Sequence, residues 1–125
     1  MELSSISTAA LAYLGDAVLE LLVREHLLMT GYSSSKSLNA HARAFVSAPA
    51  QAAAMERLHH LLTEEEETIF RRGRNIGHTN TPKSATVAEY RAATGMETLF
   101  GYLHCLGRKE RLEELFFNAY LKEGV

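Results

Sequence analysis

Apolar residues recur at helical spacing along most of the chain, and no segment has the two-residue period of a strand. The clearest helix is residues 8–29, where apolar side chains fall on two opposite stripes. One stripe holds Leu11, Leu14, Val18, Leu21 and Leu22, and the other holds Ala9, Ala12, Val23 and Leu27. The pattern therefore predicts an all-α protein whose first helix is enclosed by protein on every side.

Start and stop signals divide the chain into helices. Two capping boxes, Thr63–Glu66 and Thr86–Glu89, predict helix starts, because each supplies side-chain partners for the first free amides of a helix. Glycine at position 31 and again at 107 predicts helix ends. The predicted helices cover about residues 8–30, 37–45, 48–62, 64–73, 87–106 and 108–122.

Composition narrows the class of protein. The 125 residues are 46% hydrophobic and 22% charged, so we expect one soluble globular domain over residues 1–125. The net charge is −2, so any surface for nucleic acid must be a local patch. A single cysteine allows no internal disulfide and no CxxC zinc site, which favours a reducing cytoplasm. Charged residues interrupt the longest apolar stretch, so no membrane span is expected.

Asp16 is the only aspartate in the chain, and it stands within the most apolar helix. A carboxylate enclosed by apolar protein is costly unless a cation or hydrogen-bond donors meet it. We therefore expect a positive partner there. The partner is either a metal ion or an arginine, for which the candidates are Arg24, Arg43 and Arg91.

Glu97 is a second isolated acid. It is the only charged residue in 92–107 with histidine neutral, and its helical neighbours are small: Ala93, Thr94, Thr98 and Gly101. If the helices that carry Asp16 and Glu97 meet, the two carboxylates repel one another unless a cation lies between them. Hard oxygen ligands suit Mg²⁺ or Mn²⁺. The alternative is that arginines or backbone donors hold each acid separately.

A basic segment without acids lies between Glu67 and Glu89. Arginine and lysine with small polar donors are typical of contact with the phosphate backbone, which positions a duplex without reading its sequence. Glycine and proline predict a mobile basic loop at about 74–85. The alternative is that the arginines only complement a helix C-terminus. The candidate RNA-binding residues are Arg71, Arg72, Arg74, Asn75 and Lys83.

The segment from Tyr13 to Glu20, Tyr-Leu-Gly-Asp-Ala-Val-Leu-Glu, resembles the signature helix of the ribonuclease III catalytic domain. With no double-stranded-RNA-binding domain in the chain, it is most similar to the Mini-ribonuclease III branch of that family. Further matching segments are Phe45–Ser47, Arg72–Asn75, Thr81–Lys83, Tyr90–Arg91 and Met96–Tyr102.

The resemblance implies a helical homodimer with the signature helices at the subunit interface. It implies Mg²⁺-dependent hydrolysis of double-stranded RNA, with Mn²⁺ able to substitute, in the maturation of both ends of the 23S ribosomal RNA precursor in the cytoplasm. A ribosomal protein on the substrate is a further expected partner. Asp16 matches the essential aspartate of the family and Glu97 its late glutamate, so both are expected to be catalytic and to bind the metal.

Two positions depart from full-length ribonuclease III, which has carboxylates where this chain has Ala12 and Thr94. Only two strong carboxylates per centre remain. Glu20 and Thr94 are expected to lie next to these two ligands without binding the metal themselves. These losses leave an alternative open, a domain that binds structured RNA or ribosomal particles without cutting. A weaker alternative is a helical nucleotide pyrophosphohydrolase that uses the acids of residues 64–67.

Overall fold

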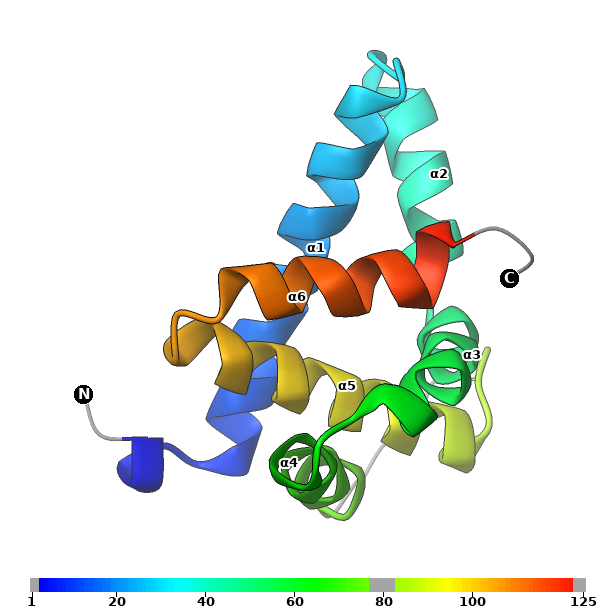
Figure 1. Ribbon diagram of the computed structural model, residues 1–125. Helices are drawn as coiled ribbons and strands as arrows, with labels where there is room; N and C mark the ends of the chain where they lie inside the picture. Colours follow the sequence, from blue (N-terminus) through cyan, green and yellow to red (C-terminus); the bar gives the residue numbers. More distant parts are fainter. Residues whose placement is uncertain (1–2, 77–82, 123–125) are drawn as a thin grey trace.

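The computed structural model describes residues 3–76 and 83–122, and all regular structure within these ranges is helical. The prediction of an all-α fold is confirmed. The described residues form these helices in order: η1 (Leu3–Ser5), α1 (Thr8–Met29), α2 (Ser35–Val46), α3 (Ala48–Leu58), η2 (His59–Leu61), α4 (Glu64–Arg74), α5 (Val87–Cys105), α6 (Lys109–Phe116) and η3 (Phe117–Leu121) (Figure 1).

Side-chain caps fix most of the helix starts. Both predicted capping boxes are present, with the side chain and backbone of each pair bonded reciprocally. Serine hydroxyls begin the three other long helices, each accepting a hydrogen bond from the amide three residues on, and these are Ser7 for α1, Ser34 for α2 and Ser47 for α3. The sequence therefore determines these boundaries locally.

Two helix ends differ from the prediction. The helix predicted to reach residue 62 ends at Leu58 and tightens into η2, and the backbone is then extended at Leu62 and at Thr63, the N-cap of α4. The last helix ends at Phe116 and widens into the π-turn η3, where the Asn118 side-chain amide donates to the carbonyl of Glu114 at 2.8 Å.

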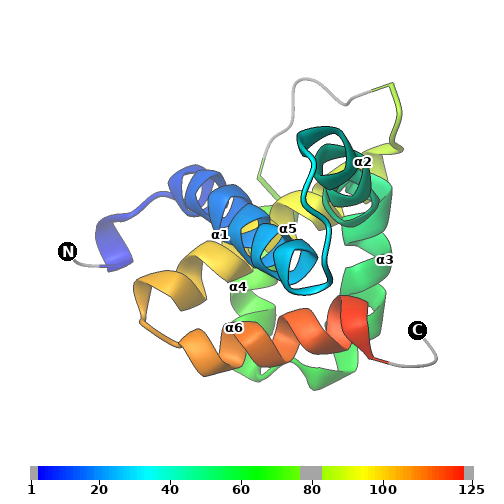
Figure 2. The ribbon, with the colours of Figure 1, turned by 90° about the horizontal axis from the view of Figure 1, so that it is seen from above.

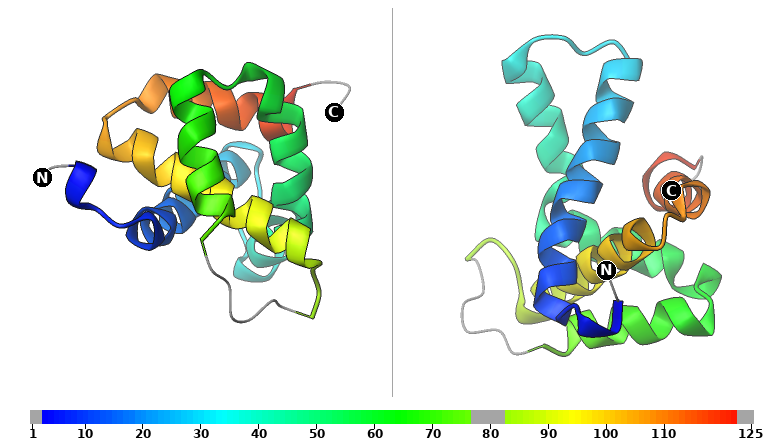
Figure 3. Two further views of the ribbon diagram at one scale, coloured as in Figure 1. Left: turned by 90° about the horizontal axis from the view of Figure 1, so that it is seen from below. Right: turned by 90° about the vertical axis from the view of Figure 1, so that its left-hand side faces the viewer.

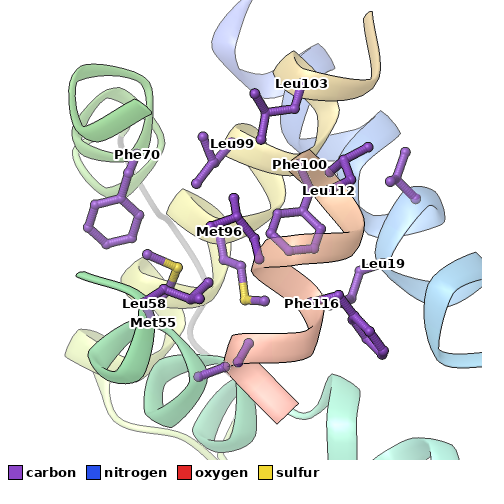
Figure 4. Close-up of a cluster of buried hydrophobic side chains, with 14 of the residues drawn as sticks. Leu19, Met55, Leu58, Phe70, Met96, Leu99, Phe100, Leu103, Leu112 and Phe116 are labelled. Atoms are coloured by element: carbon purple, nitrogen blue, oxygen red, sulfur yellow. The ribbon is translucent and has the colours of Figure 1, made fainter. Parts of the chain in front are cut away.

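Helix α5 is the centre of the molecule, and α1, α3, α4 and α6 pack around it (Figures 1 and 2). Most of its apolar side chains after the first turn are buried, and Met96, Leu99 and Phe100 are fully buried. Figure 4 shows side chains of the surrounding helices, such as Phe70 of α4 and Phe116 of α6, converging on them. Because α5 is buried on nearly every side, a polar side chain on it is largely shielded from water.

The C-terminal half of α1 and helix α2 form an arm that projects away from this core, as the right-hand view of Figure 3 shows. The side of α1 turned away from α5 is uncovered: Tyr13 is 85% exposed, Leu21 57% and Leu28 61%. The prediction that the first helix is enclosed on every side is therefore wrong for the single chain, because α5 and α2 cover only part of its circumference. None of the described helices is long and apolar enough to cross a membrane.

Candidate functional site

Helices α1 and α5 cross with their backbones in direct contact. A Cβ atom on Gly15 would overlap the carbonyl of Glu97, and one on Gly101 would overlap the carbonyl of Leu11. Only glycine permits this approach, because any side chain would separate the two helices. The crossing places Asp16, which follows Gly15, beside Glu97 of α5.

The carboxyl groups of Asp16 and Glu97 interact directly. Burial, then the negative charge of Asp16, then a hydrogen bond shared with Asp16 raise the pKa of Glu97 from 4.5 to about 8, whereas a hydrogen bond with Gln51 acts in the opposite direction. The carboxyl of Glu97 therefore retains its proton more readily than an ordinary glutamate in the metal-free protein. A divalent cation between the two carboxylates would remove the repulsion that retains this proton.

Asp16 itself is exposed, so the expectation of a buried aspartate is wrong for the single chain. It lies at the edge of the contact between α1 and α5, where solvent reaches it. Among the described residues no ion pair includes it, and the candidate partner Arg24 is instead bonded to Glu20 at 3.2 Å. One acid of the pair is open to solvent and the other is half-buried, which is an arrangement that a ligand can reach from outside.

Gln51 of α3 is a site residue that the sequence reasoning missed. Its side chain is 2% exposed, and its Nε2 donates to the carbonyl of Val46 at 3.2 Å and lies within hydrogen-bonding reach of Glu97. Its Oε1 is a buried acceptor without a hydrogen-bond partner in the described part of the chain. The available signal was a lone amide in an alanine-rich helix, Ala48–Ala54, where a buried position would otherwise be apolar.

The two residues expected to support the site have other bonds as well. Thr94 is buried on α5, and its hydroxyl donates to the carbonyl of Tyr90 at 3.0 Å. Glu20 lies one turn after Asp16 on α1, and its carboxylate pairs with Arg24. Thr94 is uncharged and Glu20 is paired with Arg24, so neither residue acts as a further unpaired carboxylate beside Glu97.

The basic residues of α4 lie next to the same stretch of α5. Gly73 packs so closely on Thr98 and Gly95 that a Cβ atom there would collide with both. This contact brings the end of α4, with its arginines, beside the segment of α5 that carries Glu97.

The described basic side chains differ in how firmly they are held. Arg71 pairs with Glu67 at 3.1 Å, which agrees with the alternative that it complements its own helix. Arg72 Nη2 donates to Thr8 Oγ1 at 3.0 Å, across to the start of α1. Arg74 lies over the ring of Phe70 at 5.9 Å.

The remaining candidates flank the part of the loop that is not described. The side-chain oxygen of Asn75 accepts from Arg74 Nε at 3.3 Å, and Lys83 is exposed. Of the predicted basic loop at 74–85, residues 77–82 lie outside the described residues.

The donor set at the site consists of oxygen atoms from two carboxylates and one amide. No cluster of three histidine, cysteine or acidic side chains that could hold a metal occurs among the described residues. Oxygen ligands few in number, one of them open to solvent, suit a hard cation that keeps several waters, as Mg²⁺ does. The unpartnered oxygen of Gln51 offers such a hydrated ion a hydrogen-bond acceptor.

Comparison with known proteins gives consistent matches over most of the chain. The model of the ribonuclease III domain family matches residues 9–108. The Mini-ribonuclease 3 of Symbiobacterium thermophilum is 51% identical over 105 residues, which cover 84% of this chain and 81% of that protein. The Mini-ribonuclease 3 of Enterococcus faecalis is 45% identical over 117 residues, which cover 92% and 89%. A crystal structure from Fusobacterium nucleatum matches with a TM-score of 0.80 and 34% identity, over 89% of this chain and 88% of that chain.

Proposed function

Because the chain belongs to the ribonuclease III family and is an endoribonuclease of that type, we propose that it hydrolyses double-stranded RNA with Mg²⁺ at the Asp16–Glu97 pair. The observation that carries the proposal is the contact between these two carboxyl groups at the glycine crossing of α1 and α5. Acids that are otherwise far apart in the sequence gain nothing in stability from this contact, whereas a cation turns it into a binding site.

The residues of the chain divide the work of hydrolysis between them. Asp16 and Glu97 would hold Mg²⁺, or Mn²⁺ in its place. The ion supplies positive charge that stabilises the phosphate in the transition state and makes water more acidic. Glu97 releases its proton when it takes up this role, and Gln51 steadies the carboxylate that results. Glu20 and Thr94 complete the surroundings without adding a ligand.

The duplex would be bound by the basic side chains at the end of α4 and beyond. Arg71, Arg72, Arg74, Asn75 and Lys83 are proposed to contact phosphates. Phosphate contacts fix the register of a duplex on a protein without selecting its sequence. The close packing of Gly73 on Thr98 and Gly95 supports this proposal, because it brings the end of α4 against the same helix that carries Glu97.

A homodimer is proposed, formed through the uncovered face of α1. Tyr13, Leu21 and Leu28 of this face are exposed and lie about two turns apart on the helix, which is typical of a helix that packs against a second one. A twofold axis there would give two centres, one for each strand of a duplex.

The proposed substrate is the 23S ribosomal RNA precursor, cut at both ends in the cytoplasm. This proposal follows from the resemblance of the signature helix and the other motifs to the Mini-ribonuclease III branch, and the relatives named Mini-ribonuclease 3 support membership in that branch over most of the chain. A small protein with a net charge of −2 has little long-range attraction for RNA. We therefore propose that a ribosomal protein bound to the precursor helps the enzyme to recognise it.

The test is cleavage of a duplex RNA by wild type and by Asp16→Asn, each with Mg²⁺ and with EDTA. We expect wild type to cut only with the metal, and the variant to lose at least about 10³-fold in rate while keeping its fold, because one of two anionic ligands is gone. Circular dichroism checks the fold. Binding without cutting by wild type would instead favour the domain that only docks on RNA, and an active Asp16→Asn variant would refute the assignment.

A further inference from the structure

The buried amide of Gln51 remains incompletely explained by its structural bonds. Its Nε2 closes the corner between α2 and α3 by donating to the Val46 carbonyl. That bond leaves the carbonyl oxygen Oε1 buried and without a partner among the described residues. Buried polar atoms are almost always hydrogen-bonded in native proteins, so an unpaired acceptor marks a place where another group belongs.

The position of this amide indicates which group belongs there. Gln51 reaches Glu97 from α3, whereas Asp16 reaches it from α1. Its donor hydrogens can hold the carboxyl of Glu97 in one orientation without adding a charge to the site. Gln51 is also the only glutamine in the chain.

Charge explains why an amide suits this position. Two carboxylates already repel one another at the site, and a third would increase that repulsion in the metal-free protein. Ala12 supplies no oxygen, and the hydroxyl hydrogen of Thr94 is already donated to the Tyr90 carbonyl. Among these three, only the neutral amide offers both a donor and an unused acceptor.

We infer that Gln51 is a positioning residue of the metal centre. Its amide holds the carboxylate of Glu97 in the orientation that binds the metal, and its free oxygen accepts a hydrogen bond from a water of the hydrated ion. This inference rests on the proposed function, because it assigns Gln51 to the same centre. It adds a neutral partner, donated by α3, to the two acids of α1 and α5.

The test measures binding of Mn²⁺ alone, from the electron paramagnetic resonance signal of the free ion, to wild type and to Gln51→Leu, Gln51→Glu and Met55→Leu. We expect Gln51→Leu to weaken Mn²⁺ binding by about 10- to 100-fold, the usual effect of removing a group that orients a metal ligand. Gln51→Glu adds a negative charge beside the ion but loses the donor hydrogens that hold Glu97, so its affinity for Mn²⁺ should differ from that of wild type at least several-fold. Met55→Leu, a buried change on the same helix, should bind as wild type does.

Kinetics give a second readout. Gln51→Leu should lower kcat for duplex RNA at saturating metal and leave KM for RNA unchanged, because the buried, uncharged side chain of Gln51 is not among the proposed phosphate contacts. A purely structural role predicts that Gln51→Leu and Gln51→Glu lower thermal stability but bind Mn²⁺ like wild type, and that result overturns the inference. If Gln51→Leu does not fold, unchanged Mn²⁺ affinity of Gln51→Glu overturns it alone.

Asp16→Asn separates the two levels of the proposal. If this variant loses Mn²⁺ binding and Gln51→Leu does not, the metal centre stands and only the role of Gln51 is wrong. If wild type binds Mn²⁺ no better than Asp16→Asn, the proposed centre fails, and the role of Gln51 fails with it.

Discussion

At the scale of single residues, Glu97 has the most unusual chemistry in the described chain. Its backbone lies against Gly15, its carboxyl faces that of Asp16, and burial removes the water that would stabilise its charge. A site that strains a carboxylate in this way when empty gains most when a cation arrives. The same strain should be measurable as a cost to the stability of the metal-free protein.

We predict that the free energy of unfolding of the metal-free wild type falls as the pH rises from about 4.5 to 8. The unfolded chain ionises Glu97 near 4.5, whereas the folded chain retains the proton to about 8, so stability is highest below the unfolded pKa and is lost through this window. Glu97→Gln removes the dependence and should be more stable than wild type above pH 8 by about 2 kcal/mol. Thermal unfolding in EDTA across this pH range measures the difference.

A matched control for this prediction is Glu113→Gln on the exposed face of α6. It should follow the wild-type pH profile. Parallel profiles for wild type and Glu97→Gln would contradict the prediction, because they would mean that the carboxyl of Glu97 ionises equally easily in the folded and unfolded chains.

At the scale of elements, a partly buried ion pair joins the start of α4 to α6. Glu66 is 2% exposed, and Arg111 contacts both of its oxygens, at 2.7 and 2.8 Å, while also donating to the Leu61 carbonyl at 2.8 Å. These hydrogen bonds with Arg111 are the main reason that the pKa of Glu66 is lowered. Glu66, at the start of α4, therefore has a structural role in joining α4 to α6. This role argues against the pyrophosphohydrolase alternative, in which the acids of residues 64–67 would bind a metal.

We predict that Arg111→Met destabilises the protein by about 3 kcal/mol, because it leaves the buried carboxylate of Glu66 without its partner. Arg108→Met is the matched control: its partner Glu65 is half-exposed, so the free energy of unfolding should hardly change. Denaturant unfolding measures both. Since the pKa of Glu66 is lowered, the contribution of the pair is present above about pH 4.5 and is lost as the pH falls. Equal effects of the two substitutions would show that burial of Glu66 does not matter.

At the scale of the whole molecule, the exposed face of α1 is the largest departure from an ordinary surface. Tyr13, Leu21, Leu28 and Met29 are all at least half exposed on this helix. Asp16 lies on the same helix close to this face, so a subunit bound there would enclose the open side of the acid pair. Assembly and catalysis are thereby linked in the proposed dimer.

We predict that wild type sediments as a dimer and that Leu21→Arg sediments as a monomer with unchanged helix content. A charged side chain at the centre of an apolar helix interface is costly when buried and costs nothing when exposed. Phe117→Arg, at a similarly exposed apolar position on η3, should remain dimeric. A dimeric Leu21→Arg would place the interface elsewhere, and a monomeric wild type would refute the proposed dimer.

Most of the local structure could be predicted from the sequence because its causes are local. The serine caps, the two capping boxes and the glycines at 31 and 107 act within a few residues, and the structure contains each of them. The prediction of an enclosed first helix was wrong, because burial of α1 depends on which later helices pack against it. In the single chain these helices leave one face of α1 uncovered. Likewise α3 ends before the predicted residue, where the chain tightens into η2 and then extends at Leu62.

The sequence by itself determined the helices, their caps and the isolation of Asp16 and Glu97 in nearly uncharged segments, because each depends on neighbours along the chain. Only the tertiary structure decided that the two acids meet, since their contact requires Gly15 and Gly101 to bring α1 and α5 together. It also decided that the buried amide of Gln51 on α3 lies against Glu97, because a contact between residues 46 positions apart depends on how α3 and α5 pack.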